Sequence, residues 1–122
     1  MYLVGSAHAH TADAQRLLER AVSDGDKRVT SADVFQEILH RYTAIGRRDA
    51  IQPAWDVLAA MVDEVFPIEL TDTDRARAIV LERPMLSARD ALHAAVMQRH
   101  GVSRIMSFDA GFDVLPGLAR VH

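Results

Sequence analysis

The stretch that decides the fold covers residues 87–117 and reads SARDALHAAVMQRHG followed by VSRIMSFDAGFDVLPG. Ser87 is a favourable N-cap residue, and Asp90 lies in the first turn of the helix that Ser87 would open. Apolar residues follow at helical spacing, and Gly101 is a typical helix end. A short apolar run then favours a β-strand that ends shortly before Asp109. Two carboxylates are therefore predicted at one end of consecutive elements, which is the edge where open parallel sheets bind ligands.

Helices and short strands alternate along the rest of the chain. Cap residues, glycine stops and apolar spacing predict helices that begin at Thr11, Ser31, Pro53 and Thr71, the last with Asp74 in its first turn. On the third helix, the residues expected to face inward are Ala54, Val57, Leu58, Met61 and Val65. Short strands are expected over residues 27–30, 65–70 and 118–121, the second at a sheet edge because it contains Pro67. The alternation predicts an α/β fold: a parallel sheet with helices on both faces.

Composition restricts the class of protein. A chain of 122 residues, 49% hydrophobic and 25% charged, predicts one soluble domain over residues 1–122. It has no cysteine, and we expect neither a membrane span nor a signal peptide, which together fit a cytoplasmic protein. A net charge of −3 means that binding to nucleic acid would depend on a local arginine patch and a metal ion.

A third acid joins Asp90 and Asp109. Glu37 lies beside the apolar stripe of its predicted helix and not on the opposite face. Each acid alone has an ordinary structural explanation: Asp90 as a capping carboxylate, Asp109 as a turn residue and Glu37 as the ion-pair partner of Arg41. However, each acid follows a different strand or the loop that leaves the sheet. All three are therefore expected to converge at one edge.

Three ionised carboxylates that lie so close together need a compensating charge. At a separation of about 5 Å and an effective dielectric near 20, each pair repels by about 3 kcal/mol. Three such pairs amount to about 10 kcal/mol, comparable with the stability of a whole domain. The cluster must take up protons or hold a cation, and oxygen ligands without thiolates favour Mg²⁺ or Mn²⁺. The predicted chemistry is metal-assisted hydrolysis of a phosphodiester.

Residues 87–95 and 105–113 resemble the C-terminal half of PIN-domain ribonucleases, and the most similar subgroup is the VapC-type toxins of bacterial toxin–antitoxin pairs. Residues 30–39, TSADVFQEIL, resemble the middle motif of the same family. The resemblance covers almost the whole chain and implies an α/β/α sandwich around a short parallel sheet. It implies Glu37, Asp90 and Asp109 as metal-site acids, and Asp113 as an auxiliary acid. Ser31 and Ser107 match small polar positions beside that site.

The function that the resemblance implies is a Mg²⁺- or Mn²⁺-dependent endoribonuclease, the toxin of a type II toxin–antitoxin system. It also implies an RNA substrate, a small antitoxin as partner and a homodimer. The alternative is a PIN-like module that binds a partner protein or RNA without catalysis.

The chain departs from the family at its start. The family pattern opens with a strand that carries a metal-binding Asp, in Asp-Thr-Asn or Asp-Ser-Ser, whereas residues 2–6 resemble the segment that follows this motif. We therefore expect the usual first strand to be missing or truncated, with a natural start upstream of Met1. Absence of this strand would expose the edges of neighbouring strands.

The histidines and arginines allow other interpretations. The pairs Glu37/His40 and Asp90/His93 each share a helix face, as in di-iron bundles, but the predicted helices are too short for that fold. His93 is expected to be an ordinary helix residue near the sheet, and His8 and His10 to lie in a loop. Three arginines follow Glu37, namely Arg41, Arg47 and Arg48, and they form either a solvated face or a patch that steers phosphates. Two aromatic residues, Tyr42 and Trp55, either stack a base or lie in the core or an interface.

Overall fold

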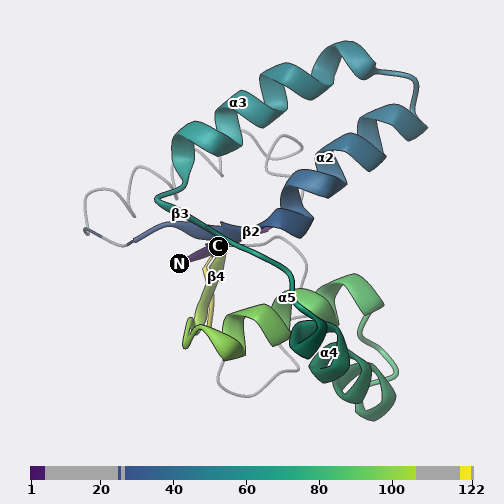
Figure 1. Cartoon of the computed structure of the whole chain (residues 1–122), viewed down its shortest axis with the longest axis vertical. Coiled ribbons are helices and arrows are strands. Elements are labelled where there is room, and N and C mark those ends of the chain that lie inside the picture. The colour runs from purple at the N-terminus through teal and green to yellow at the C-terminus, as the bar shows by residue number, and fades with distance from the viewer. Residues whose placement is uncertain (5–24, 26, 107–118, 122) are drawn as a thin grey trace.

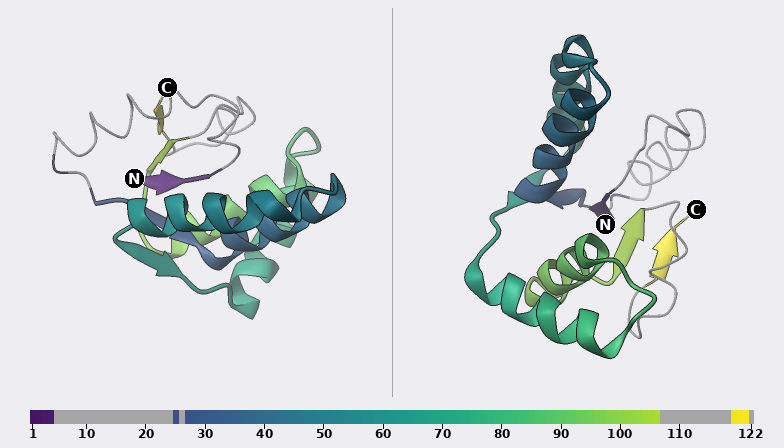
Figure 2. Two further views of the ribbon diagram at one scale, coloured as in Figure 1. Left: turned by 90° about the horizontal axis from the view of Figure 1, so that it is seen from above. Right: turned by 90° about the vertical axis from the view of Figure 1, so that its right-hand side faces the viewer.

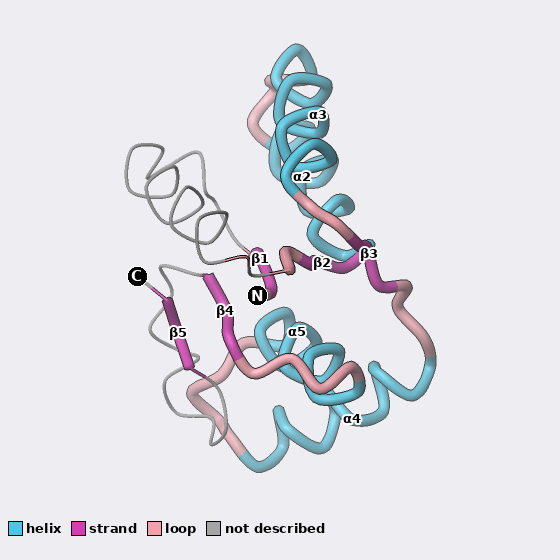
Figure 3. The backbone as a smooth tube through the Cα atoms, turned by 90° about the vertical axis from the view of Figure 1, so that its left-hand side faces the viewer, coloured by secondary structure: helices cyan, strands magenta, loops and turns pink. Residues whose placement is uncertain are grey.

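The computed structural model describes residues 1–4, 25, 27–106 and 119–121. Its centre is a sheet of five parallel strands in the order β3-β2-β1-β4-β5 (Figures 1 and 3). The strands are short: β1 Tyr2–Leu3, β2 Val29–Ser31, β3 Glu64–Phe66, β4 Arg104–Met106 and β5 Ala119–Val121. The predicted α/β fold with a parallel sheet flanked by helices is confirmed. Pro67 directly follows β3, which is an edge strand as expected.

The central position of the sheet is filled by β1. Tyr2 pairs with Val29 of β2 and with Ile105 of β4, and the Thr30 hydroxyl donates a buried hydrogen bond of 2.7 Å to the Leu3 carbonyl. β1 is two residues long. The exposed edges expected in the absence of a first strand are not found at this place in the described sheet, because the segment predicted to follow that strand pairs with both β2 and β4.

The helices form two groups, seen from two directions in Figure 2. Helices α4, Leu70–Glu82, and α5, Ala88–Arg99, pack against each other beside the sheet. Helices α2, Ala32–Ala44, and α3, Ile51–Met61, run side by side as an arm that projects from the sheet, joined through the 3₁₀ turn Arg48–Ala50. Within the described part of the chain, no helix has the length and apolarity needed to cross a membrane.

Helix α5 is the most deeply buried helix of the described chain. Ala91, Ala94 and Ala95 face the core with at most 2% of their surface exposed, and Val96 and Met97 are completely buried. The small alanine side chains let the helix backbone approach its neighbours closely. The helix ends as predicted, because Gly101 adopts a φ of 68° that other residues rarely tolerate. The first turn of α5 is therefore held on a well-packed element.

The arm differs from the sequence prediction. Helix α3 begins at Ile51, ahead of Pro53, and contains no buried residue. Val57, predicted to face inward, has 60% of its surface exposed, and Val65 has 41% exposed. The apolar spacing on α3 correctly indicates a helix, and Leu58 packs against the core as predicted. Trp55 of the same helix contacts Phe35 of α2 with ring centroids 4.6 Å apart.

Of the predicted N-cap residues that the structure describes, only Ser87 makes a side-chain capping hydrogen bond. The Ser87 Oγ accepts a hydrogen bond of 3.1 Å from the Asp90 backbone N–H. Ser31 stands at the N-cap position of α2, but its side chain makes no capping bond and faces Tyr2 instead. Helix α4 is opened by a capping box of Glu69 and Asp72, two residues before the predicted Thr71 and Asp74.

Replacement of Ser87 by alanine is expected to lower the free energy of unfolding by about 1 kcal/mol, because the Asp90 N–H then loses its capping acceptor. Denaturant unfolding of the two proteins measures this difference. Ser103→Ala is a suitable control, since Ser103 is exposed and lies outside the helices. Equal midpoints for Ser87→Ala and the wild type would contradict the capping role.

Candidate active site

The topology brings the start of α2 and the start of α5 to one edge of the sheet. Helix α2 leaves β2 directly at Ser31, so its first turns lie at the carboxyl end of that strand. Helix α5 leads into the parallel strand β4, so its first turn returns to the same edge. In open α/β sheets this edge is where ligands bind.

Glu37 on α2 contacts two side chains of α5. Its Oε1 lies 3.0 Å from Nε of Arg89 and 3.1 Å from Nε2 of His93, both on α5. The Glu37 side chain is mostly shielded, whereas 57% of the Arg89 side chain is exposed. Glu37 thus pairs with Arg89, the residue directly before Asp90, and not with Arg41, the partner in its ordinary structural explanation.

His93 is more than the ordinary helix residue predicted from the sequence. Its side chain is completely buried. Its Nδ1 lies 2.7 Å from the Tyr2 hydroxyl, which lies 2.8 Å from Ser31 Oγ. Its Nε2 faces Glu37 and lies 3.6 Å from Oδ2 of Asp33. Ser31 therefore belongs to the hydrogen-bond network beside the acids.

Asp33 is the second acid that α2 contributes. It lies four positions before Glu37, so both carboxylates share one helix face, a signal that could have identified it from the sequence. Burial raises the pKa of the Asp33 carboxyl; nearby His93 opposes the shift, and the Glu37 carboxylate reinforces it. Burial also raises the pKa of the Tyr2 phenol, so this hydroxyl keeps its proton at neutral pH.

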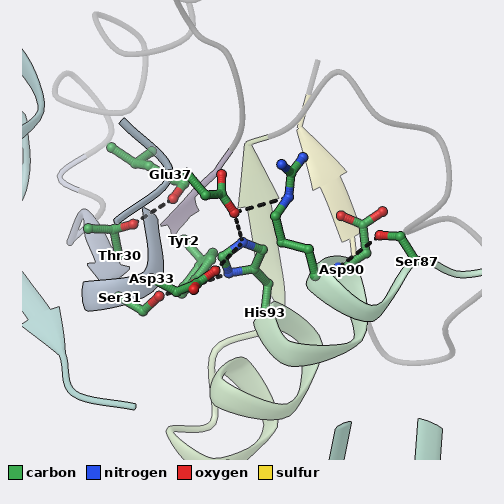
Figure 4. Close-up of polar contacts among 10 residues, drawn as sticks. Tyr2, Thr30, Ser31, Asp33, Glu37, Ser87, Asp90 and His93 are labelled. Carbon is green, nitrogen blue, oxygen red and sulfur yellow. Dashed lines mark hydrogen bonds and ion pairs between the residues drawn. The ribbon is translucent and has the colours of Figure 1, made fainter. Parts of the chain in front are cut away.

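Among the residues that the structure describes, one group of potential metal ligands stands out. Single ligand atoms of Asp33, Glu37 and His93 all lie within 4.8 Å of one another (Figure 4). The two carboxylates supply oxygen ligands of the kind that Mg²⁺ or Mn²⁺ binds, and the imidazole of His93 lies beside them. Two acids that share a site also need a positive charge to limit their repulsion. The residues present therefore fit a metal ion.

Asp90 lies at the start of α5, next to the Arg89 that contacts Glu37. It is buried, with 6% of its surface exposed. Figure 4 shows its carboxylate near Ser87, apart from the group formed by Asp33, Glu37 and His93. The structure thus brings Glu37 and Asp90 to one edge of the sheet but not into one ligand group of the described side chains.

The other residues singled out in the sequence do not belong to this group or fall outside the described residues. Asp109, Asp113, Ser107, His8, His10 and the helix predicted from Thr11 lie outside the described residues. His40 is exposed, and the parallel sheet rules out the di-iron bundle. Arg47 is paired with Asp49 at 3.0 Å in the loop after α2.

The sequence matches known proteins over nearly its whole length. The family model described as PIN domain matches residues 1–118. Ribonuclease VapC13 of Mycobacterium tuberculosis is 60% identical over 121 residues, which cover 99% of this chain and 92% of that protein. Ribonuclease VapC23 of the same organism is 39% identical over 109 residues, 89% of this chain and 86% of that protein.

A solved structure shares the fold. VapBC2 from Rickettsia felis, bound to a DNA fragment from its promoter, superposes with a TM-score of 0.76 at 14% identity, covering 98% of this chain and 96% of that chain. The parallel sheet and its flanking helices are therefore arranged as in this solved structure. The chain belongs to the PIN-domain family and, within it, to the VapC group.

Proposed function

We propose that this chain is a metal-dependent endoribonuclease that acts as the toxin of a type II toxin–antitoxin pair. The relatives that share 60% and 39% of its sequence are named ribonucleases. The observation that carries the proposal is the contact of 3.0 Å between Glu37 on α2 and Arg89, the neighbour of Asp90, on α5. It supports a shared site for two acids that are far apart in the sequence.

The proposed metal site consists of Glu37, Asp90 and Asp109, with Asp113 as an auxiliary acid. Mg²⁺ or Mn²⁺ is the proposed cation, because the acids supply oxygen ligands. When bound, such a cation activates water and stabilises negative charge on a phosphate oxygen. In this proposal the acids of the chain hold and orient the cation.

Arg89 is proposed to bind the RNA backbone. Its guanidinium contacts Glu37 while more than half of its side chain remains exposed. A guanidinium can present two N–H donors to a phosphate, so Arg89 can pass from the Glu37 carboxylate to a phosphate of bound RNA.

The proposed partners are an antitoxin and a second copy of the chain. A solved structural neighbour is a complex of a VapB and a VapC protein, as its description VapBC2 states. The arm of α2 and α3 exposes apolar side chains, among them Leu39, Ile45 and Val57, as expected of a helical pair that meets another subunit. We propose a single cytoplasmic domain over residues 1–122.

Removal of metal is expected to abolish cleavage of a structured RNA by this chain. The assay compares the protein in Mn²⁺, in Mg²⁺ and after EDTA treatment, with gel analysis of the products. Cleavage that EDTA stops and added Mn²⁺ restores is the predicted result. Cleavage at an unchanged rate in EDTA would contradict metal dependence, and intact RNA in every metal would contradict the nuclease function.

A further inference from the structure

His93 is a buried polar residue in an otherwise apolar stretch of α5. Its neighbours Ala94, Ala95, Val96 and Met97 are all buried core residues. Placing an imidazole in such surroundings is costly unless both ring nitrogens have hydrogen-bond partners. Both nitrogens have them here: Nδ1 meets the Tyr2 hydroxyl at 2.7 Å, and Nε2 meets Glu37 at 3.1 Å.

The Tyr2 side chain fixes the ring of His93 from the middle of the sheet. Tyr2 is itself completely buried on β1, and its hydroxyl lies 2.8 Å from Oγ of Ser31 at the end of β2. The rings of Tyr2 and His93 lie 5.5 Å apart at an angle of 56°. Two strands and one helix therefore hold the imidazole in one orientation, with Nε2 directed at the carboxylates of α2.

This orientation matters most for Glu37. An ionised carboxylate only accepts hydrogen bonds, so Nε2 carries the proton in the contact with Glu37. His93 and Arg89 both act on the same oxygen, Oε1, which leaves Oε2 as the oxygen that these donors do not use. Arg89 is largely exposed, whereas His93 is enclosed. The enclosed imidazole is therefore the donor that sets the direction of the carboxylate.

We propose that His93 is a positioning residue of the metal site: with Tyr2 and Ser31 behind it, it holds Glu37 through Oε1 and so leaves the second carboxylate oxygen available to a cation. The inference rests on the proposed function, which gives Glu37 the role of a metal ligand. Groups that orient a metal ligand in this way typically change metal affinity about 10- to 100-fold when removed. His93 thus acts through Glu37 and does not itself touch the reacting atoms.

The first test measures binding of Mn²⁺ by titration calorimetry. His93→Leu is expected to weaken Mn²⁺ binding at least about 10-fold, and His93→Gln, whose amide can still donate to Glu37, to remain within about 3-fold of the wild type. Tyr2→Phe removes a single oxygen and is expected to fall between them. His40→Gln, on the exposed face of α2, is the control. A folded His93→Leu protein with wild-type affinity would overturn the proposal.

The second test needs neither metal nor activity. The ring Nε2–H of His93 is expected to give a protected NMR signal that shifts in Glu37→Gln and stays in place in Glu82→Gln, an exposed acid of α4. A signal that Glu37→Gln leaves unmoved would overturn the inference even if His93→Leu fails to fold. If wild-type protein binds Mn²⁺ with the predicted dependence on His93 but leaves RNA intact, only the proposed function fails.

Discussion

Replacement of Glu37 by glutamine is expected to slow RNA cleavage at least about 100-fold while leaving the fold unchanged. The amide oxygen of glutamine can still accept from His93 and Arg89, so the contacts that join α2 to α5 remain possible. The negative charge that attracts the cation is lost, and a bound metal contributes several kcal/mol to a phosphodiester reaction. A loss of about 3 kcal/mol corresponds to the expected factor of about 100.

The matched control for this variant is Glu82→Gln. Glu82 ends α4 and is exposed, so the substitution makes the same chemical change away from the sheet edge. Single-turnover cleavage in Mn²⁺ measures both rates, and circular dichroism checks the fold. If the Glu37→Gln protein cleaves RNA as fast as the Glu82→Gln protein, Glu37 is not part of the active site.

Replacement of Asp72 by alanine is expected to have the largest effect on stability, lowering the free energy of unfolding by about 3 kcal/mol. Asp72 is 1% exposed and joins α4 to α5 through two bonds to Arg99, Nε–Oδ1 at 2.6 Å and Nη2–Oδ2 at 2.9 Å. It also accepts from the Glu69 N–H, which completes the capping box of α4. Arg99 remains partly exposed and can be hydrated, so the loss is at the lower end for a buried pair.

Asp74→Asn on the same helix is the control, because the pair of Asp74 with Arg77 is exposed and is expected to contribute less than about 1 kcal/mol. Urea unfolding of both variants provides the comparison. A loss for Asp72→Ala no greater than that for Asp74→Asn would contradict the importance of the ion pair.

The same carboxyl predicts a dependence of stability on pH. Burial acts to raise the pKa of Asp72, but the Arg99 guanidinium and the Glu69 N–H outweigh it and hold the pKa below its usual range. The stabilisation is therefore complete above the unfolded-state pKa of about 4 and is lost as the pH falls through the folded-state value. Asp72→Asn is expected to flatten the acid limb of the stability curve.

Much of the fold could be predicted from local signals. Ser87 and Gly101 bound α5 within one residue, because capping and positive φ are properties of the residues themselves. The strand at Tyr2–Leu3 could not be predicted, since its place in the centre depends on edges that β2 and β4 offer. The inward face of α3 was wrong at Val57, because helical spacing identifies an apolar face but not what covers it.

The candidate site was predicted in part. Glu37 could be singled out from its motif and its place beside an apolar stripe, and the structure puts it at the junction of α2 and α5. Asp33 was not singled out, although its place four positions before Glu37 is visible in the sequence. The role of His93 could not be predicted, because its contacts with α2 join distant parts of the chain and depend on how two helices pack. His93 in particular has the sequence context of a core residue, and only its neighbours Tyr2 and Glu37 give it a further role.

The central claim is that Glu37 and Asp90 hold one cation at the carboxyl edge of the sheet, and binding of Mn²⁺ to the metal-free chain tests it most directly. Titration calorimetry of the wild type, Glu37→Gln, Asp90→Asn and the control Asp74→Asn compares the affinities. We predict one Mn²⁺ per wild-type chain, binding at least about 10-fold weaker in both Glu37→Gln and Asp90→Asn, and no change in Asp74→Asn. If Asp90→Asn binds Mn²⁺ as tightly as the wild type, a site shared by Glu37 and Asp90 is contradicted, whether or not Glu37→Gln binds more weakly.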